Sequence, residues 1–286
     1  MLSRKWLLFA VITTLFWGVW GAFIEIPEKA GFPATLGYTV WALTTIPCAL
    51  VALRLVGWKL ERDPRSIFLG SIVGFLGAGG QLVLFEALRL GPAYLVFPLI
   101  SVYPVLTVVL SVAFLHERGS RRAWAGIVLA VVAMAALSYV PPGPSAAQGR
   151  LWILLALLVF AAWGIQAFFM KFSNATMQAE SIYFYMSATG IALIPVALAM
   201  TDFGKPINWG WKGPALAALI QSLNAIGALT LVYAVRYGKA IIVVPMTSLA
   251  PVLTIILSLV IYQVMPHPVL VAGMVFAAIA IYLLAE

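Results

Sequence analysis

The sequence predicts an all-α integral membrane protein with ten transmembrane helices, arranged as two inverted five-helix repeats. Three observations lead to this prediction. Hydrophobic residues make up 64% of the 286 residues and charged residues only 9%, a composition unlike that of a water-soluble domain. The apolar residues fall into ten runs of about the length that crosses a bilayer. A stretch of the first half also recurs in the second half at a constant shift in numbering.

Each predicted helix is an apolar run that ends at charged residues or at glycine and proline, because a bilayer core of roughly 30 Å needs about 20 helical residues. The first run resembles a signal peptide, but it is long enough to span the membrane and has no clear small-residue cleavage site, so we expect it to be retained. Short turns at Gly91 and at Gly238 separate the third run from the fourth and the eighth from the ninth, where one longer run is the alternative. The ten runs are 6–24, 34–54, 67–88, 93–115, 123–140, 151–171, 181–200, 213–235, 240–262 and 268–284.

The basic residues predict the orientation of these helices. If the N-terminus is cytoplasmic, 12 of the 17 Lys and Arg residues fall on the cytoplasmic side and 5 on the other, as the positive-inside rule requires. With ten spans the C-terminus is then cytoplasmic too. The net charge of +8 is therefore explained by membrane loops, and it does not indicate a nucleic-acid partner.

An internal duplication divides the chain into halves. Residues 86–111 align without gaps with residues 233–258, and 13 of the 26 positions are identical, where chance would give roughly three. We predict a first repeat over 1–140, a linker over 141–150 and a second repeat over 151–286. Because five spans is an odd number, the second copy would enter the membrane from the opposite side. Inverted repeats of this kind are typical of secondary transporters.

The duplicated segments resemble the EamA-type family of the drug/metabolite transporter superfamily. The resemblance is carried by residues 87–129, which include a helix tip with Glu117, and by their second copy, 234–276. It implies ten helices in inverted 5+5 symmetry, a central cavity between the halves, and carriage of small metabolites, often as export. The second copy has Val264 at the position of Glu117, so the acidic tip is present once only. We expect the protein in the cytoplasmic (inner) membrane of a bacterium.

Four prolines at matching positions are candidate bend points: Pro98, Pro104, Pro245 and Pro251. A proline inside a helix removes one backbone hydrogen bond and frees a carbonyl, which in hydrocarbon must find a partner or face a cavity. Bent segments at corresponding places of two halves indicate a transport site. Static kinks that only shape the bundle are the alternative interpretation.

Polar residues within the runs are the candidate cargo contacts. Side-chain amides both donate and accept hydrogen bonds and are penalised in lipid, so they should face inward. Glu86 could bind a cationic group or a proton, or it could pair with Arg89 on the same helix face. For the aromatic residues, an interfacial or packing role is the alternative. The predicted substrate-binding residues are Trp17, Gln81, Glu86, Tyr103, Gln166, Gln221 and Asn224.

No catalytic or metal-binding constellation is present in the sequence. The two histidines, His116 and His267, are predicted on opposite sides of the membrane, and the single cysteine, Cys48, permits no intramolecular disulfide. We therefore expect no enzyme activity, no cofactor and no metal. The expected partners are the lipid bilayer and a small-molecule substrate, and the oligomeric state is not predicted. The expected function is a secondary transporter, in the direction of export, for a small neutral or zwitterionic metabolite such as an amino acid. A membrane channel or a lipid translocator is the alternative.

Overall fold

A computed structural model describes residues 4–142, 150–262 and 266–285, and these form helices and turns with no strand. The predicted linker falls largely on residues 143–149, and these, like Val264, lie outside the described residues. The helices are α1 (Lys5–Phe23), α2 (Glu25–Lys29), α3 (Ala34–Leu55), α4 (Pro64–Leu90), α5 (Ala93–Ser101), α6 (Pro104–Leu115), α7 (Arg121–Leu137), α8 (Leu151–Asn174), α9 (Ala179–Ala192), α10 (Ile194–Ala199), α11 (Leu216–Tyr237), α12 (Ala240–Thr247), α13 (Pro251–Tyr262) and α14 (Pro268–Leu284), and α11 is preceded by a turn (Trp211–Ala215) that is kinked at Gly213.

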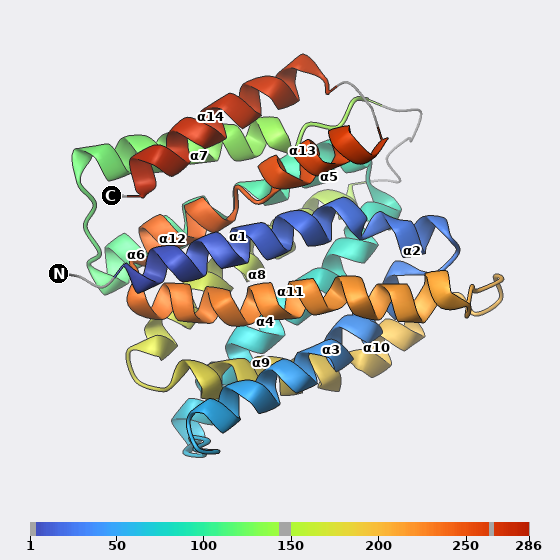
Figure 1. Cartoon of the computed structure of the whole chain (residues 1–286), viewed down its shortest axis with the longest axis horizontal. Helices are drawn as coiled ribbons and strands as arrows, with labels where there is room; N and C mark the ends of the chain where they lie inside the picture. The colour runs from blue at the N-terminus through green and yellow to red at the C-terminus, as the bar shows by residue number, and fades with distance from the viewer. Residues whose placement is uncertain (1–3, 143–149, 263–265, 286) are drawn as a thin grey trace.

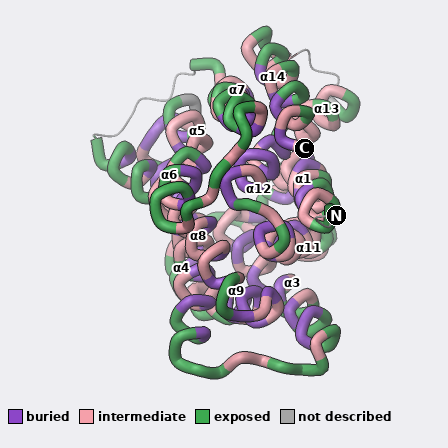
Figure 2. Tube along the Cα trace, turned by 90° about the vertical axis from the view of Figure 1, so that its left-hand side faces the viewer, coloured by how far each residue is buried: buried purple, intermediate pink, exposed green. Residues whose placement is uncertain are grey.

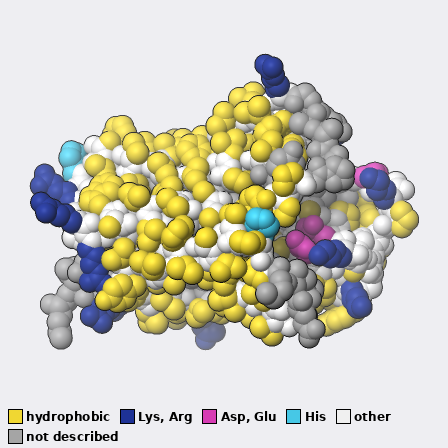
Figure 3. Space-filling view, turned by 90° about the horizontal axis from the view of Figure 1, so that it is seen from above, with side chains coloured by type: hydrophobic (Ala, Val, Ile, Leu, Met, Phe, Trp, Pro, Cys, Tyr) yellow, Lys and Arg dark blue, Asp and Glu magenta, His cyan; other side chains and the backbone are white. Residues whose placement is uncertain are grey.

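The prediction of a helical membrane protein is confirmed. Eight helical segments of the described chain are long and apolar enough to cross a bilayer, and α14 is a shorter apolar helix of 17 residues. The helices form an elongated bundle whose flank is largely hydrophobic, with Lys and Arg side chains at both ends of the visible face (Figure 3). Ten spans and an inverted orientation of the halves remain predictions.

Local sequence signals explain where several helices begin. The Asp63 carboxylate accepts a hydrogen bond from the Ser66 backbone N–H at 3.0 Å and caps α4, whose first residue is Pro64. Hydrogen bonds from Ser66 lower the pKa of the Asp63 carboxyl because they favour its charged form. The Ser120 hydroxyl accepts from the backbone N–H of Ala123 at 3.1 Å in the same way and begins α7.

Three of the predicted runs are each divided into a pair of helices, and the seventh run is α9 and α10, which are separated at Leu193. The fourth run is α5 and α6, which are separated at Val102 and Tyr103, and the ninth is α12 and α13, which are separated at residues 248–250. Pro104 and Pro251 each begin the second helix of a pair, where the missing proline N–H costs nothing. Pro98 and Pro245 instead lie inside α5 and α12.

Both chain termini lie at one end of the bundle, which we call the terminal end (Figure 1). The same end holds the end of α11 and the beginning of α12, whereas α2 lies at the opposite end. The α7 and α14 helices pack against each other along one side of the bundle. Buried residues lie on the inward faces of the helices and exposed residues on the outside, as the tube in Figure 2 shows. The core is therefore a layer between helices of the two halves.

One close helix crossing occurs twice. A Cβ added to Gly18 on α1 would lie 2.6 Å from the Cβ of Leu253 on α13, and a Cβ added to Gly164 on α8 would lie 2.8 Å from that of Leu106 on α6. Gly164 corresponds to Gly18 at a shift of 146, and Leu253 corresponds to Leu106 at a shift of 147. Glycine is required at both places because the partner helix approaches too closely for any side chain.

Candidate functional site

The first group of predicted site residues lies where α1 packs against α11. The indole N–H of Trp17 donates to the backbone carbonyl of Asn224 at 3.4 Å, and the ring lies over Gly227, where an added Cβ would come within 2.5 Å. The indole N–H of Trp20 donates to Oε1 of Gln221 at 3.0 Å, and Gln221 is buried. The structure therefore brings Trp17, Gln221 and Asn224 together, and it adds Trp20, which was not among the predicted residues.

The equivalent crossing of α4 and α8 holds a second group. The indole N–H of Trp163 donates to the Gly77 carbonyl at 3.3 Å. The Gln166 amide also lies over Gly77, where an added Cβ would be 2.2 Å from Nε2. Gln81 follows Gly77 by one helical turn on α4, so it lies on the same side of that helix. Both glutamines are half-buried, and no described residue forms a hydrogen bond with either side chain.

Tyr103 joins the two helix breaks. Its hydroxyl lies 3.0 Å from the Oγ of Ser248, so the break between α5 and α6 meets the break between α12 and α13. The Tyr103 ring also packs edge-on against Trp163, with the ring centroids 5.8 Å apart. In the duplication Ser248 corresponds to Ser101. The alignment of the two halves therefore gave no reason to pair Ser248 with Tyr103.

Glu86 lies apart from these interior contacts. It sits one turn before the end of α4 and forms an ion pair with Arg89, in which the Arg89 Nε donates to Oε2 at 2.8 Å. About a third of the Glu86 side chain is exposed. Of the two interpretations of Glu86, the geometry matches local pairing near the helix end.

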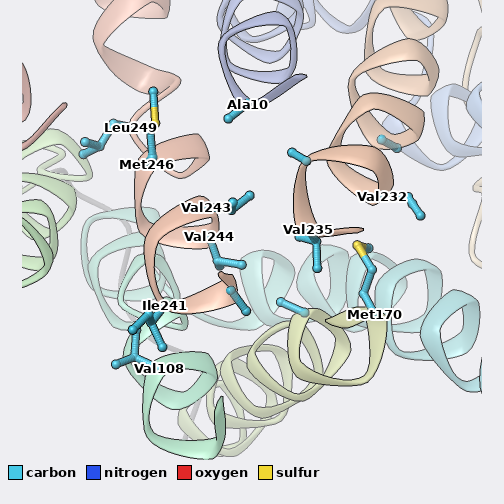
Figure 4. Packing of buried hydrophobic residues seen from close by; sticks show 14 of the residues in the cluster. Ala10, Val108, Met170, Val232, Val235, Ile241, Val243, Val244, Met246 and Leu249 are labelled. Carbon is cyan, nitrogen blue, oxygen red and sulfur yellow. The ribbon is translucent and has the colours of Figure 1, made fainter. Parts of the chain in front are cut away.

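The terminal end of the bundle is closed by α12. Seven of its eight residues are buried, and their side chains pack against α1, α6, α8 and α11 around Val243, Val244 and Met246 (Figure 4). The corresponding helix of the first half, α5, is less enclosed. Val244 is 2% exposed, whereas its counterpart Phe97 is 38% exposed. The two halves thus differ in packing at matching positions.

A groove of about 560 Å³ lies elsewhere, between α6 and α7. Its walls are apolar throughout and include the exposed side chains of Val109, Trp124 and Val128. Such a surface suits lipid chains, since it offers no hydrogen bond to a polar cargo. None of the predicted site residues lines it. Among the described residues, no three His, Cys, Asp or Glu side chains gather into a possible metal site.

The arrangement defines a polytopic helical membrane protein whose polar and aromatic interior residues lie at two equivalent helix crossings. A family model of the EamA-like transporter family matches the chain twice, over residues 4–139 and 150–285. The chain belongs to this family, which confirms the resemblance drawn from residues 87–129 and their copy.

The chain is also similar to curated proteins and to a solved structure. The chain is 26% identical to Protein RarD of Streptomyces exfoliatus over 244 residues, covering 82% of this chain and 71% of that protein. It is 21% identical to Protein LicB of Haemophilus influenzae over 210 residues, covering 70% of each. A crystal structure matches with a TM-score of 0.77 at 18% identity, covering 96% of this chain and 97% of the other. That likeness shows the fold alone.

Proposed function

We propose that the protein is a secondary transporter that works by alternating access between two inverted five-helix repeats, 1–140 and 151–286. The main support for this proposal is that each half of the chain contacts the other half in the same way. The first helix of each half presents a tryptophan, Trp17 or Trp163, to the third helix of the other half, over Gly227 and Gly80. Reciprocal contacts of this kind support a pseudo-two-fold axis, which gives one chain two similar end states.

The residues at these crossings suit a small neutral or zwitterionic cargo, such as an amino acid. Gln81 and Gln166 each present an amide that can donate and accept, and neither is satisfied by another described residue. A multiply anionic cargo would need Arg or Lys between the crossings, whereas Lys171 lies near the end of α8. The helix breaks that meet at Tyr103 and Ser248 lie between the two halves, as expected of a transport site. Export is the proposed direction.

The orientation is a separate part of the proposal. With ten spans and both termini in the cytoplasm of a bacterial inner membrane, the terminal end faces the cytoplasm. The close packing of α12 then corresponds to a state that is closed toward the cytoplasm. In this state the less enclosed α5 faces the outside.

Cysteine labelling in intact cells tests the orientation. In a Cys48→Ser background, Arg62→Cys in the segment between α3 and α4 should be protected from a membrane-impermeant maleimide, because that segment is predicted to be cytoplasmic. Lys205→Cys, between α10 and α11, should react at once. Reaction of both sites from the same side would refute the inverted arrangement.

Transport itself is tested with purified protein in proteoliposomes. A thermal-stability screen against amino acids, sugars, nucleosides and cationic drugs first identifies the cargo, because a bound ligand stabilises the folded state by mass action. Efflux of that cargo should saturate with concentration and should be accelerated by cargo on the opposite side. Flux that rises linearly without saturation would contradict alternating access and favour a channel or a lipid translocator.

A further inference from the structure

A buried carboxylate holds the beginning of α12. The Glu117 side chain follows α6, is 8% exposed, and accepts hydrogen bonds from the backbone N–H groups of Ala240 and Ile241 at 3.1 and 3.0 Å. These are the first two residues of α12, whose N–H groups have no partner within the helix. An anion at this position is also favoured by the helix dipole. Glu117 therefore fastens α12, in the second half of the chain, to α6 in the first.

A lysine holds the end of the preceding helix. The Lys171 ammonium, near the end of α8, donates to the carbonyl oxygens of Val235 and Gly238, with 3.0 Å to the former. These carbonyls belong to the last turn of α11 and to its C-cap. The Lys171 Nζ also lies 3.9 Å from Glu117 Oε1. The turn between α11 and α12 is thus held on one side by a cation and on the other by an anion, and the two charges attract each other.

This turn carries the segment that closes the terminal end. The buried α12 side chains, including Val243 and Val244, follow it directly and fill the space between α1, α6 and α8. To expose these side chains, α12 must move away from α6, and the bonds to Glu117 must then break. Breaking these bonds has a cost, because the carboxylate, which is 8% exposed, would lose two charge-assisted hydrogen bonds.

The other end of the bundle lacks these charges at the matching positions. Lys171 corresponds to Glu25 at the shift of 146 that relates Trp163 to Trp17. Glu25 forms an exposed ion pair with Lys29 of its own short helix. Glu117 corresponds in sequence to Val264, whose side chain has no atom that accepts a hydrogen bond. The second copy therefore keeps matching glycines, but the sequence positions that correspond to Lys171 and Glu117 hold no second lysine and no second glutamate, respectively.

We infer that Glu117 and Lys171 form a latch that holds the protein in its cytoplasm-closed state, and that cargo must displace this latch to open the cytoplasmic side. The inference rests on the proposed function. Because no described residue forms an equivalent latch at the other end, the two end states are unequal in free energy, and the resting protein occupies the closed state shown here. Both residues act through the position of α12, without contacting cargo.

A pair of matched reporters tests the latch. In the Cys48→Ser background, Val244→Cys reports on the closed end and Phe97→Cys on the equivalent position of the other end. The protein is reconstituted in nanodiscs, where a maleimide reaches both faces. Before any latch residue is changed, Phe97→Cys should react fast and Val244→Cys slowly. Glu117→Gln should accelerate labelling of Val244→Cys roughly tenfold or more and slow that of Phe97→Cys, because one population grows as the other falls.

Further variants distinguish a latch from a general contribution of these two residues to the stability of the fold. Lys171→Met should shift both reporters in the same directions as Glu117→Gln, and Lys171→Arg should restore part of the original rates because it keeps the charge. Asp202→Asn, which removes an exposed ion pair with Lys205 at the opposite end, is the matched control and should change neither rate. Unchanged labelling of Val244→Cys in both latch variants would overturn the inference. Faster labelling of both reporters in both variants would also overturn it, because that pattern indicates loosening of the whole fold.

The two proposals fail in different ways. Saturable flux of the unmodified protein together with unchanged reporter rates would refute the latch and leave the transporter standing. Linear flux together with opposite shifts of the two reporters would refute the transporter and leave a latch on a conformational equilibrium.

Discussion

Gly18→Ala and Gly164→Ala should each lower the free energy of unfolding by about 1–3 kcal/mol, the usual cost of inserting a methyl group into a close-packed interface. The clash is severe because the new Cβ would meet the Cβ of Leu253 or of Leu106, and neither atom can rotate away from its own helix. The helices must then separate. This would also disturb the bond from the Thr254 hydroxyl to the Gly18 carbonyl, which is 2.9 Å long.

Thermal unfolding in detergent micelles measures the effect, and Gly79→Ala on α4 is the matched control. A Cβ at Gly79 would meet only the tip of the Phe75 ring, at 4.0 Å. This substitution should therefore leave stability unchanged or raise it by about 0.5–1 kcal/mol, since alanine favours the helix over glycine. A loss of stability at Gly79 equal to that at Gly18 would show that close packing is not what these glycines supply.

Gln81→Leu and Gln166→Leu should each weaken cargo binding roughly tenfold or more. A hydrogen bond lost to a buried polar cargo group costs about 1–3 kcal/mol, and every 1.4 kcal/mol is a factor of ten in affinity. Stability without cargo should stay the same or rise, because the leucine replaces an amide that no other described residue satisfies. Cargo-induced thermal stabilisation gives the affinity, and the cargo-free midpoint gives the stability.

Ser222→Ala on α11 is the control for this pair. Its hydroxyl donates to the Ala218 carbonyl of its own helix at 2.7 Å, so its loss should leave cargo affinity within about twofold, a free-energy change of roughly 0.4 kcal/mol. If both glutamine variants bound cargo as tightly as the unmodified protein, the site would have to lie away from the crossing of α4 and α8.

The helical membrane fold follows from sequence because the required length of apolar helix is set by the bilayer. The duplication can be seen in the sequence because residues such as Gly91 and Pro98 recur in the second half at a fixed shift in numbering. The helix breaks were less predictable. Pro98 and Pro104 carry the same local signal, but only Pro104 begins a new helix. Neighbouring helices decide which proline ends a helix in a membrane, since they supply partners for the freed backbone groups.

The candidate site residues were chosen from their chemistry, and their contacts could not be predicted. Amides within apolar runs are expected to face inward, and Gln81 and Gln166 are half-buried. Trp20 and Ser248 gave no such signal, because a tryptophan near a helix end is typical of the interface and a serine packs anywhere in a membrane helix. Their partners, Gln221 and Tyr103, are 201 and 145 residues away in sequence.

The division of the fourth and ninth membrane runs into short helices has a consequence for engineering. In α5 and α12 the chain has two pieces of nine and eight residues that end at breaks, so these pieces can tilt without bending a full-length helix. The long crossings of α1 with α11 and of α4 with α8 would then remain intact through a turnover. Substitutions that improve packing along those crossings, away from the predicted cargo contacts, should thus make the protein more robust to heat and detergent without slowing it down.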